Sequence, residues 1–230
     1  MLGTIVNTAT IIVGGVIGAI LHRGVKENYQ TTLFNGLGLA SLGIGLNAFV
    51  SHIGKSEFPV LFILSLAIGG VIGTALDIDR RFKIAVDKRS KSKNKENRLA
   101  DGLAMGILLY CIGPLSMIGP VMSALQGDNT FLFTNATLDF VSSMVLASTY
   151  GVGMILAAPV LFCWQGMFYL VAKISSTAIS DALVSELCIT GGLLIVASGL
   201  SLLKIKDCKT LNLLPSLLVP VIWFVIKSFL

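Results

Sequence analysis

RRFKIAVDKRSKSKNKENR, at residues 80–98, interrupts an otherwise apolar chain and carries nine of its seventeen basic residues. On both sides lie runs of about 18–22 residues with almost no charge, the length that an α-helix needs to cross a hydrocarbon core roughly 30 Å thick. A charged side chain at the bilayer centre costs at least ~2.5–3.5 kcal/mol. The segregation of charge therefore indicates a chain that crosses a membrane several times.

Composition excludes several classes of protein. Of the 230 residues, 54% are hydrophobic and only 13% are charged, which excludes an ordinary soluble domain. The net charge of +5 is concentrated in one loop and is not spread as a nucleic-acid footprint would be, so we expect no nucleic-acid partner. The four cysteines form no CxxC pair, and we expect no disulfide framework. The N-terminus lacks the basic segment of a secretory signal and is interpreted as a retained first span.

Hydropathy predicts an all-α polytopic membrane protein with eight spans and no separate soluble domain, so residues 1–230 form one integral membrane domain. The predicted spans are about 3–21, 33–50, 58–76, 101–123, 136–156, 158–177, 186–203 and 211–229. The separation of the fifth and sixth spans rests on Pro159. This proline is compatible with a tight turn between two helices or with a kink in one long helix.

The charge of the loops predicts how the spans are oriented. If the 77–100 loop is cytoplasmic, the basic loops at 22–27 and 204–209 lie on the same side. The loops with little net positive charge, and both termini, then lie outside. We therefore expect a multi-pass protein of the cytoplasmic membrane. Its partners would be the lipid bilayer and, at residues 80–98, anionic lipid headgroups that bind at about 1 kcal/mol per basic residue.

The two ends of the chain match when one is shifted by 156 positions. The shift places Gly36, Leu37, Gly43, Leu46, Pro59 and Leu61 on Gly192, Leu193, Gly199, Leu202, Pro215 and Leu217. The triplets 1–76 and 158–230 run in opposite directions by charge, which predicts an inverted-topology repeat of spans 1–3 versus spans 6–8. Between them, in 101–156, a shift of 38 pairs Asp101 with Asp139 and predicts an antiparallel central pair of spans 4 and 5. Chance matches among abundant Leu and Gly residues are the alternative.

Two acids stand at predicted span starts, Asp101 near the cytoplasmic face and Asp139 near the outer face. Acids within a span usually face the protein interior or a water-filled path. They are equally typical of helix N-caps and first turns, where the helix dipole favours them. The sequence leaves both interpretations open.

Span four contains two Gly-Pro steps, Gly113–Pro114 and Gly119–Pro120. A proline leaves a carbonyl outside the helical ladder, and in lipid such a carbonyl needs a partner from protein, water or a ligand. The span is therefore either a broken helix that lines a permeation site or a kinked packing helix. The neighbouring spans contribute further candidate residues: Ser142, Ser143 and Thr149 in span five, Asn7 in span one and Gln165 in span six. Hydroxyls also bond their own helix, and amides also bind a neighbouring helix.

Several segments carry a resemblance to a known family: MLGTIVNTATIIVGG (1–15), LLYCIGPLSMIGPVMSALQGD (108–128), LDFVSSMVLASTYGVG (138–153), and GGLLIVASGLSLLKIK (191–206) with NLLPSLL (212–218). The most specific pattern is CxGPxxxxGxxxxxxxGD, from Cys111 to Asp128. Together they resemble the YqgA/YdfK-like family of bacterial integral membrane proteins, to which no function is assigned. The resemblance implies an acid at the start of span four, where Asp101 stands in place of the usual Glu.

No phosphate loop, nucleotide fingerprint, zinc-protease motif or nucleophile elbow occurs in the sequence. We therefore expect no enzyme, and no catalytic residue, cofactor or metal. The first hypothesis is a secondary transporter or channel for a small solute or ion, and the alternative is a membrane protein with a structural, assembly or regulatory role. Either is compatible with a homo-oligomer. A polar cavity lined by Asp101, Asp139 or Ser143 would favour transport, and a dry core would favour the alternative.

Overall fold

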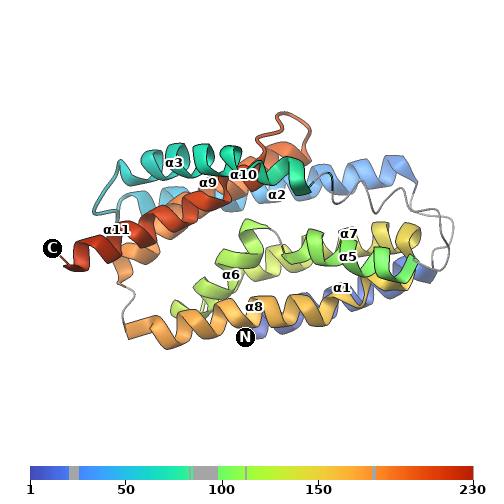
Figure 1. Ribbon diagram of the computed structural model, residues 1–230. Coiled ribbons are helices and arrows are strands. Elements are labelled where there is room, and N and C mark those ends of the chain that lie inside the picture. The colour runs from blue at the N-terminus through green and yellow to red at the C-terminus, as the bar shows by residue number, and fades with distance from the viewer. Residues whose placement is uncertain (21–25, 83, 85–97, 112, 178–179, 230) are drawn as a thin grey trace. The chain divides into compact units, whose positions relative to one another are not determined.

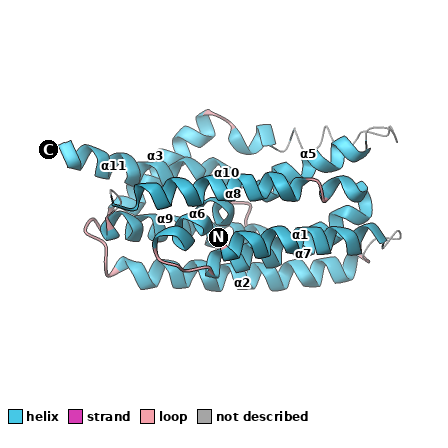
Figure 2. Ribbon diagram, turned by 90° about the horizontal axis from the view of Figure 1, so that it is seen from below, coloured by secondary structure: helices cyan, strands magenta, loops and turns pink. Residues whose placement is uncertain are grey.

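The computed structural model describes residues 1–230 apart from 21–25, 83, 85–97, 112, 178–179 and 230, and gives no side-chain description for 98–101, 104, 149–150, 177 and 228–229. The described residues form helices joined by loops and contain no strand (Figures 1 and 2). The predicted all-α class is confirmed. The basic 80–98 stretch lies mostly outside the described residues, so its contact with anionic lipid stays a prediction.

Six helical segments of the described chain are long and apolar enough to cross a membrane. They are α1 (Leu2–Ile20), α2 (Glu27–Ile53), α7 (Thr130–Tyr150), α8 (Ala157–Ile174) with the preceding 3-10 turn η2 (Gly151–Met154), α9 (Asp181–Leu202), and a composite of α10 (Thr210–Leu213), η4 (Leu214–Leu217) and α11 (Leu218–Phe229). The bent pair α5 (Arg98–Cys111) and α6 (Pro114–Leu125) makes a seventh if it counts as one span. Helix α3 (Leu61–Ala75) has 15 residues, fewer than the roughly 17 that a span needs. The predicted count of eight is therefore not reached.

The boundary between the fifth and sixth predicted spans is a true break. Helix α7 ends at Tyr150, and Gly151 follows with a φ of 79°, a conformation that only glycine adopts readily. Helix α8 begins at Ala157, so Pro159 lies in its first turn, where proline is tolerated. The glycine, rather than the proline, ends the helix.

The chain folds as two compact units. Unit 1 consists of Met1–Phe34 and Phe82–Ile174, and unit 2 of Asn35–Arg81 and Ser175–Leu230. Helix α2 passes from one to the other. Each unit thus takes segments from both halves of the sequence, and the division into triplets 1–76 and 158–230 stays a prediction.

In unit 1, α1 and α7 lie side by side and run parallel (Figures 1 and 2). A Cβ added at Gly14 would overlap the carbonyl of Phe140, and one added at Gly18 would overlap that of Met144. Glycines four residues apart on one helix therefore let the two backbones approach closely. Because the order of contacts is the same along both helices, the N-termini of α1 and α7 lie at the same end of the unit.

The broken helix of unit 1 packs against α8. A Cβ at Gly106 of α5 would lie 2.5 Å from the Cβ of Ala157 at the start of α8. Further along, Gln165 of α8 donates to the hydroxyl of Ser116 in α6 at 3.3 Å. The broken helix and α8 are therefore parallel. Unit 1 also contains an apolar core. Its buried members are Ile11, Met105, Tyr110, Cys111, Ala147, Met154, Ala157, Ala158 and Leu161.

In unit 2, α2 and α9 are antiparallel and meet at glycines. A Cβ added at Gly45 would lie 2.6 Å from the carbonyl oxygen of Gly192, and one at Gly192 would lie 2.7 Å from that of Gly45. Gly38 and Gly199 face each other in the same way, with distances of 3.2 and 2.9 Å. Helix α3 packs against the composite last helix, which contains Pro215 in its 3-10 turn.

Candidate functional site

Asp139 lies near the middle of α7, and its side chain is only 6% exposed. The prediction that it stands at the start of a span is wrong, because α7 begins at Thr130 and not near residue 136. The helix starts after Asp128, whose carboxylate accepts from the Thr130 N–H at 2.8 Å. In the first turns of the helix, Thr134 and Thr137 donate to carbonyls four residues back. A capping role for Asp139 is thereby excluded.

Side chains at four-residue intervals along α7 surround this carboxyl. The Asn135 amide donates to Asp139 Oδ2 at 2.9 Å. One turn further on, the Ser143 hydroxyl donates to the Asp139 carbonyl and forms a hydrogen bond of 2.9 Å with the hydroxyl of Tyr110. Tyr110 belongs to α5 and is 1% exposed. A hydrogen bond between Ser143 and Tyr110 therefore connects these α7 residues to α5.

Helix α1 contributes Asn7, which is 0% exposed and lies beside the Asp139 carboxyl. The only interaction of the Asn7 amide with a described side chain is with this carboxyl, and its geometry falls short of a regular hydrogen bond. Buried polar atoms without a partner are rare, because each costs about 1–3 kcal/mol of desolvation. We call Asn7, Tyr110, Asn135, Asp139 and Ser143 the Asp139 cluster.

The helix is interrupted at one of the two Gly-Pro steps and continues through the other. Helix α5 ends at Cys111, α6 begins at Pro114 with Gly113 as N-cap, and the two helices are bent by 53°. A Cβ added at Gly113 would meet nothing within 4 Å, so the break borders open space. At Pro120, by contrast, α6 continues, and Gly119 packs on Leu132 of α7.

Continuation through Pro120 leaves the carbonyl of Ser116 without its helical donor, because proline has no N–H. The hydroxyl of the same Ser116 accepts from Gln165, which is 0% exposed and whose Oε1 has no partner among the described residues. A second polar position thus lies on α6 and α8, separate from the hydrogen bonds around Asp139.

Three other residues that the sequence suggested, Ser142, Asp101 and Thr149, make no described contact with Asp139 or Gln165. Ser142 is partly exposed and forms no hydrogen bond with a described residue. Asp101 lies in the first turn of α5 and Thr149 in the last turn of α7, but their side chains are outside the described residues. Within the described part of the chain, no three His, Cys, Asp or Glu side chains gather as a metal site.

Sequence reasoning missed Asn135 and Tyr110, and it misplaced Glu186. Asn135, Asp139 and Ser143 recur at intervals of four residues, which places polar side chains on one face of a helix. This spacing could have identified Asn135 from the sequence. The predicted span 186–203 begins at Glu186, but α9 begins at Asp181, so Glu186 lies inside the helix and is 0% exposed. Ser180, the N-cap of α9, accepts from the Leu183 N–H at 3.2 Å. A serine followed by an acid is a helix-start signal that places Glu186 inside the helix.

Comparison with known proteins identifies the family. Residues 2–225 match a family model described as a protein of unknown function, DUF554, and the chain belongs to this family. It is similar to "Uncharacterized membrane protein YdfK" of Bacillus subtilis (strain 168), with 51% identity over 230 residues, 100% of this chain and 98% of the relative. It is also similar to "Uncharacterized protein YqgA" of Escherichia coli (strain K12), with 26% identity over 225 residues, 95% and 94% of the two chains. No solved structure matches the chain. The resemblance found in the sequence is confirmed.

Proposed function

We propose that this membrane protein is a small secondary transporter or channel for an ion or small solute, and that Asp139 binds or relays it. The observation that carries the proposal is a carboxyl 6% exposed near the middle of a spanning helix, with no ion-pair partner among the described Lys and Arg side chains. An acid at the centre of a bilayer costs at least ~2.5–3.5 kcal/mol, and such residues typically serve ion or proton pathways. Packing alone would favour an apolar residue there.

The surroundings of Asp139 fit a binding site better than a structural hydrogen bond. Asn7 offers both a donor and an acceptor that have no other described partner. The break at Gly113 and Pro114 leaves backbone polar groups outside a helix, in open space. Interrupted helices of this kind form the binding sites of many secondary transporters.

An inverted repeat is part of the proposal, and the packing of unit 2 supports it with a corrected register. A shift of 154 carries Gly38 onto Gly192 and Gly45 onto Gly199. The contact between Gly38 and Gly199 then maps onto the contact between Gly192 and Gly45, as a pseudo-two-fold axis requires. The residues matched by a shift of 156, such as Gly36 and Gly192, are not equivalent in packing, since a Cβ at Gly36 would meet nothing within 4 Å.

Helix directions in unit 1 agree with the same plan. Helix α1 is parallel to α7, and the broken helix is parallel to α8. The broken helix and α7 run antiparallel, since Tyr110 meets Ser143 while Gly119 meets Leu132. This supports the antiparallel central pair.

We also propose that both termini are outside and that the 77–100 loop is cytoplasmic. In unit 1, the Gly3 N–H donates to Asn129 at 3.2 Å, so the N-terminus and the α6–α7 loop share one end. In unit 2, Lys227 and Glu57 are 2.8 Å apart, so the last helix ends beside the α2–α3 loop. Each unit thus groups segments that charge assigns to the outside.

The test is flux through liposomes that contain the purified full-length protein. An internal pH-sensitive dye would report proton flux, and transport currents would be recorded as Na⁺, K⁺, NH₄⁺, Cl⁻ and small carboxylates are supplied in turn. At least one should move faster than in empty liposomes. Asp139→Asn should lower that rate roughly tenfold or more while the thermal unfolding temperature changes little, because the substitution keeps size and hydrogen bonding but removes the charge.

Asp128→Asn is the matched control. Asp128 is exposed in the neighbouring loop, and Asn also accepts a capping hydrogen bond, so flux should stay at the wild-type rate. Equal flux for Asp139→Asn and the wild type would contradict the role of Asp139. A complete absence of flux would favour the structural, assembly or regulatory alternative.

A further inference from the structure

Unit 2 buries a carboxyl of its own. The Glu186 side chain in α9 is 0% exposed, and none of the described Lys and Arg side chains pairs with it. Its Oε1 accepts from the Ser56 hydroxyl and lies 3.4 Å from the Phe58 N–H. Its Oε2 has no hydrogen-bond partner among the described residues. A buried carboxylate left so incompletely satisfied requires a neutralising partner.

A second unsatisfied oxygen lies on the same face of α9. Thr190 is one helical turn after Glu186, is 0% exposed, and its Oγ1 has no described partner. Hydroxyls in apolar helices usually donate to a carbonyl of their own helix, as Ser65, Ser198 and Ser201 do in this unit. Ser41 and Thr210 also have unpartnered hydroxyls, but only Thr190 is one turn from a buried carboxylate.

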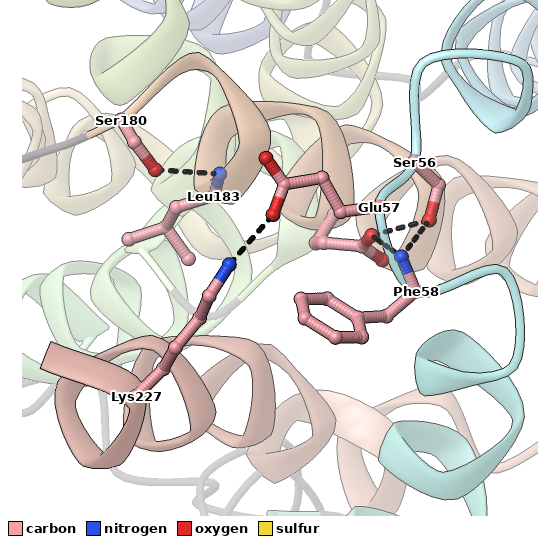
Figure 3. Close-up of polar contacts among 7 residues, drawn as sticks. Ser56, Glu57, Phe58, Ser180, Leu183 and Lys227 are labelled. Atoms are coloured by element: carbon pink, nitrogen blue, oxygen red, sulfur yellow. Dashed lines mark hydrogen bonds and ion pairs between the residues drawn. The ribbon is translucent and has the colours of Figure 1, made fainter. Parts of the chain in front are cut away.

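The loop at 54–60 lies against this position and is held by consecutive residues (Figure 3). Ser56 binds the carboxylate, and Glu57 pairs with Lys227 of α11 at 2.8 Å. The Phe58 ring makes an edge contact with Trp223 at a centroid distance of 5.5 Å, and the Lys227 ammonium lies 5.0 Å from the same ring. The Glu57 and Lys227 side chains are each 50% exposed, so the loop carries an exposed ion pair next to the buried carboxylate.

We propose that Glu186 Oε2 and Thr190 Oγ1 are ligands of a small monovalent cation of the size of Na⁺, which enters beneath the 54–60 loop. One carboxylate and one monovalent cation give a neutral pair, the arrangement that a buried site tolerates best. Hard cations prefer carboxylate and other oxygen ligands. A proton would neutralise Glu186 alone, whereas a metal cation also accounts for the free hydroxyl of Thr190.

This inference does not depend on the role proposed for Asp139. Binding at Glu186 belongs to unit 2 and can be measured at equilibrium without any flux. A protein that binds Na⁺ through Glu186 but carries nothing would refute the transport proposal and leave this one intact.

The experiment is a titration of the purified full-length protein in detergent with NaCl against choline chloride, at constant ionic strength and alkaline pH. Thermal unfolding is one readout. The second is the fluorescence of Trp223 in a Trp164→Phe background, since Trp223 touches the loop residue Phe58. Na⁺ should raise the unfolding temperature saturably, by roughly 5–10 °C at one hundred times Kd, and change the fluorescence with the same Kd. Choline should do neither.

Two variants test the ligands, and one controls for charge. Glu186→Gln should abolish the Na⁺ response, and Thr190→Val, which keeps the shape, should weaken Kd roughly tenfold or more. Glu57→Gln removes an exposed carboxylate close to the site and should keep the wild-type Kd within about threefold. If Glu186→Gln does not fold, Thr190→Val still decides the matter.

Three outcomes would overturn the proposal. The first is a wild-type response to Na⁺ no larger than to choline. The second is an unchanged response in Thr190→Val. The third is stabilisation by acidification in place of Na⁺, which would make Glu186 a proton site only.

Discussion

Each unit of this protein buries an acid that has no cationic partner among the described residues, but the two acids have different surroundings. In unit 1, Asp139 lies deep in a helix, and its neighbours Asn7, Asn135 and Ser143 are fixed on spanning helices. In unit 2, Glu186 lies near the start of a helix, and its described hydrogen-bond donors come from a loop. Rigid neighbours suit a site that is always formed, whereas a loop suits a site that opens to one side. The two proposals above assign different roles to these acids, and the difference in surroundings is consistent with that assignment.

The units also use glycine differently. In unit 1, glycines of α1 pack against the backbone of non-glycine residues, Phe140 and Met144, in the parallel helix α7. In unit 2, glycines of α2 pack against glycines of the antiparallel helix α9, so both helices lack a side chain at the points of contact. Reciprocal packing is what an inverted repeat produces within one unit.

The largest effect is expected for orientation, because labelling is all-or-none. In a background without native cysteines, Lys55→Cys in unit 2 and Gln126→Cys in unit 1 should react with an impermeant thiol reagent in intact cells. Lys206→Cys should react only after the membrane is opened. All three positions are exposed. Labelling of Lys55→Cys without labelling of Gln126→Cys would contradict the proposal that the α2–α3 loop and the α6–α7 loop lie on the same side of the membrane.

A large effect on stability is expected where glycines meet in unit 2. Gly192→Ala should lower the free energy of unfolding by about 1–3 kcal/mol, because its Cβ would lie 2.7 Å from a backbone carbonyl that cannot move freely. Thermal unfolding of the purified protein measures the change. Gly36→Ala is the control, since its Cβ would meet nothing within 4 Å, and it should be neutral or slightly stabilising. If both variants behaved alike, α2 and α9 would not pack through the described face.

The smallest effect is expected for the ion pair that holds the loop of unit 2. Lys227→Gln should cost about 1 kcal/mol or less, because both partners are 50% exposed and water screens their attraction. High salt should remove most of the difference from the wild type. A much larger loss, insensitive to salt, would mean that the loop is fixed as firmly as the neighbours of Asp139.

The parts of the candidate site that depend on neighbouring residues in the sequence could be predicted. Span four breaks at Gly113 and Pro114 because the restrictions imposed by proline are local. The same reasoning failed at Pro120, where α6 continues and the neighbouring Gly119 packs on Leu132 of α7. Asp139 was recognised as a candidate, but its depth was misjudged because the span was predicted to begin near residue 136, whereas α7 begins at Thr130.

The sequence by itself determined the membrane class, the helical fold and the family, because the cost of placing charge and free backbone groups in lipid acts on each segment alone. It could not determine which faces meet. The predicted shift of 156 rests on identical residues, whereas the contacts of Gly38 with Gly199 and of Gly45 with Gly192 are seen only in the packed helices. Only the tertiary structure decided that Glu186 is buried under a loop and that Asn7 stands beside Asp139. Both depend on contacts between segments far apart in the chain, and no local pattern carries that information.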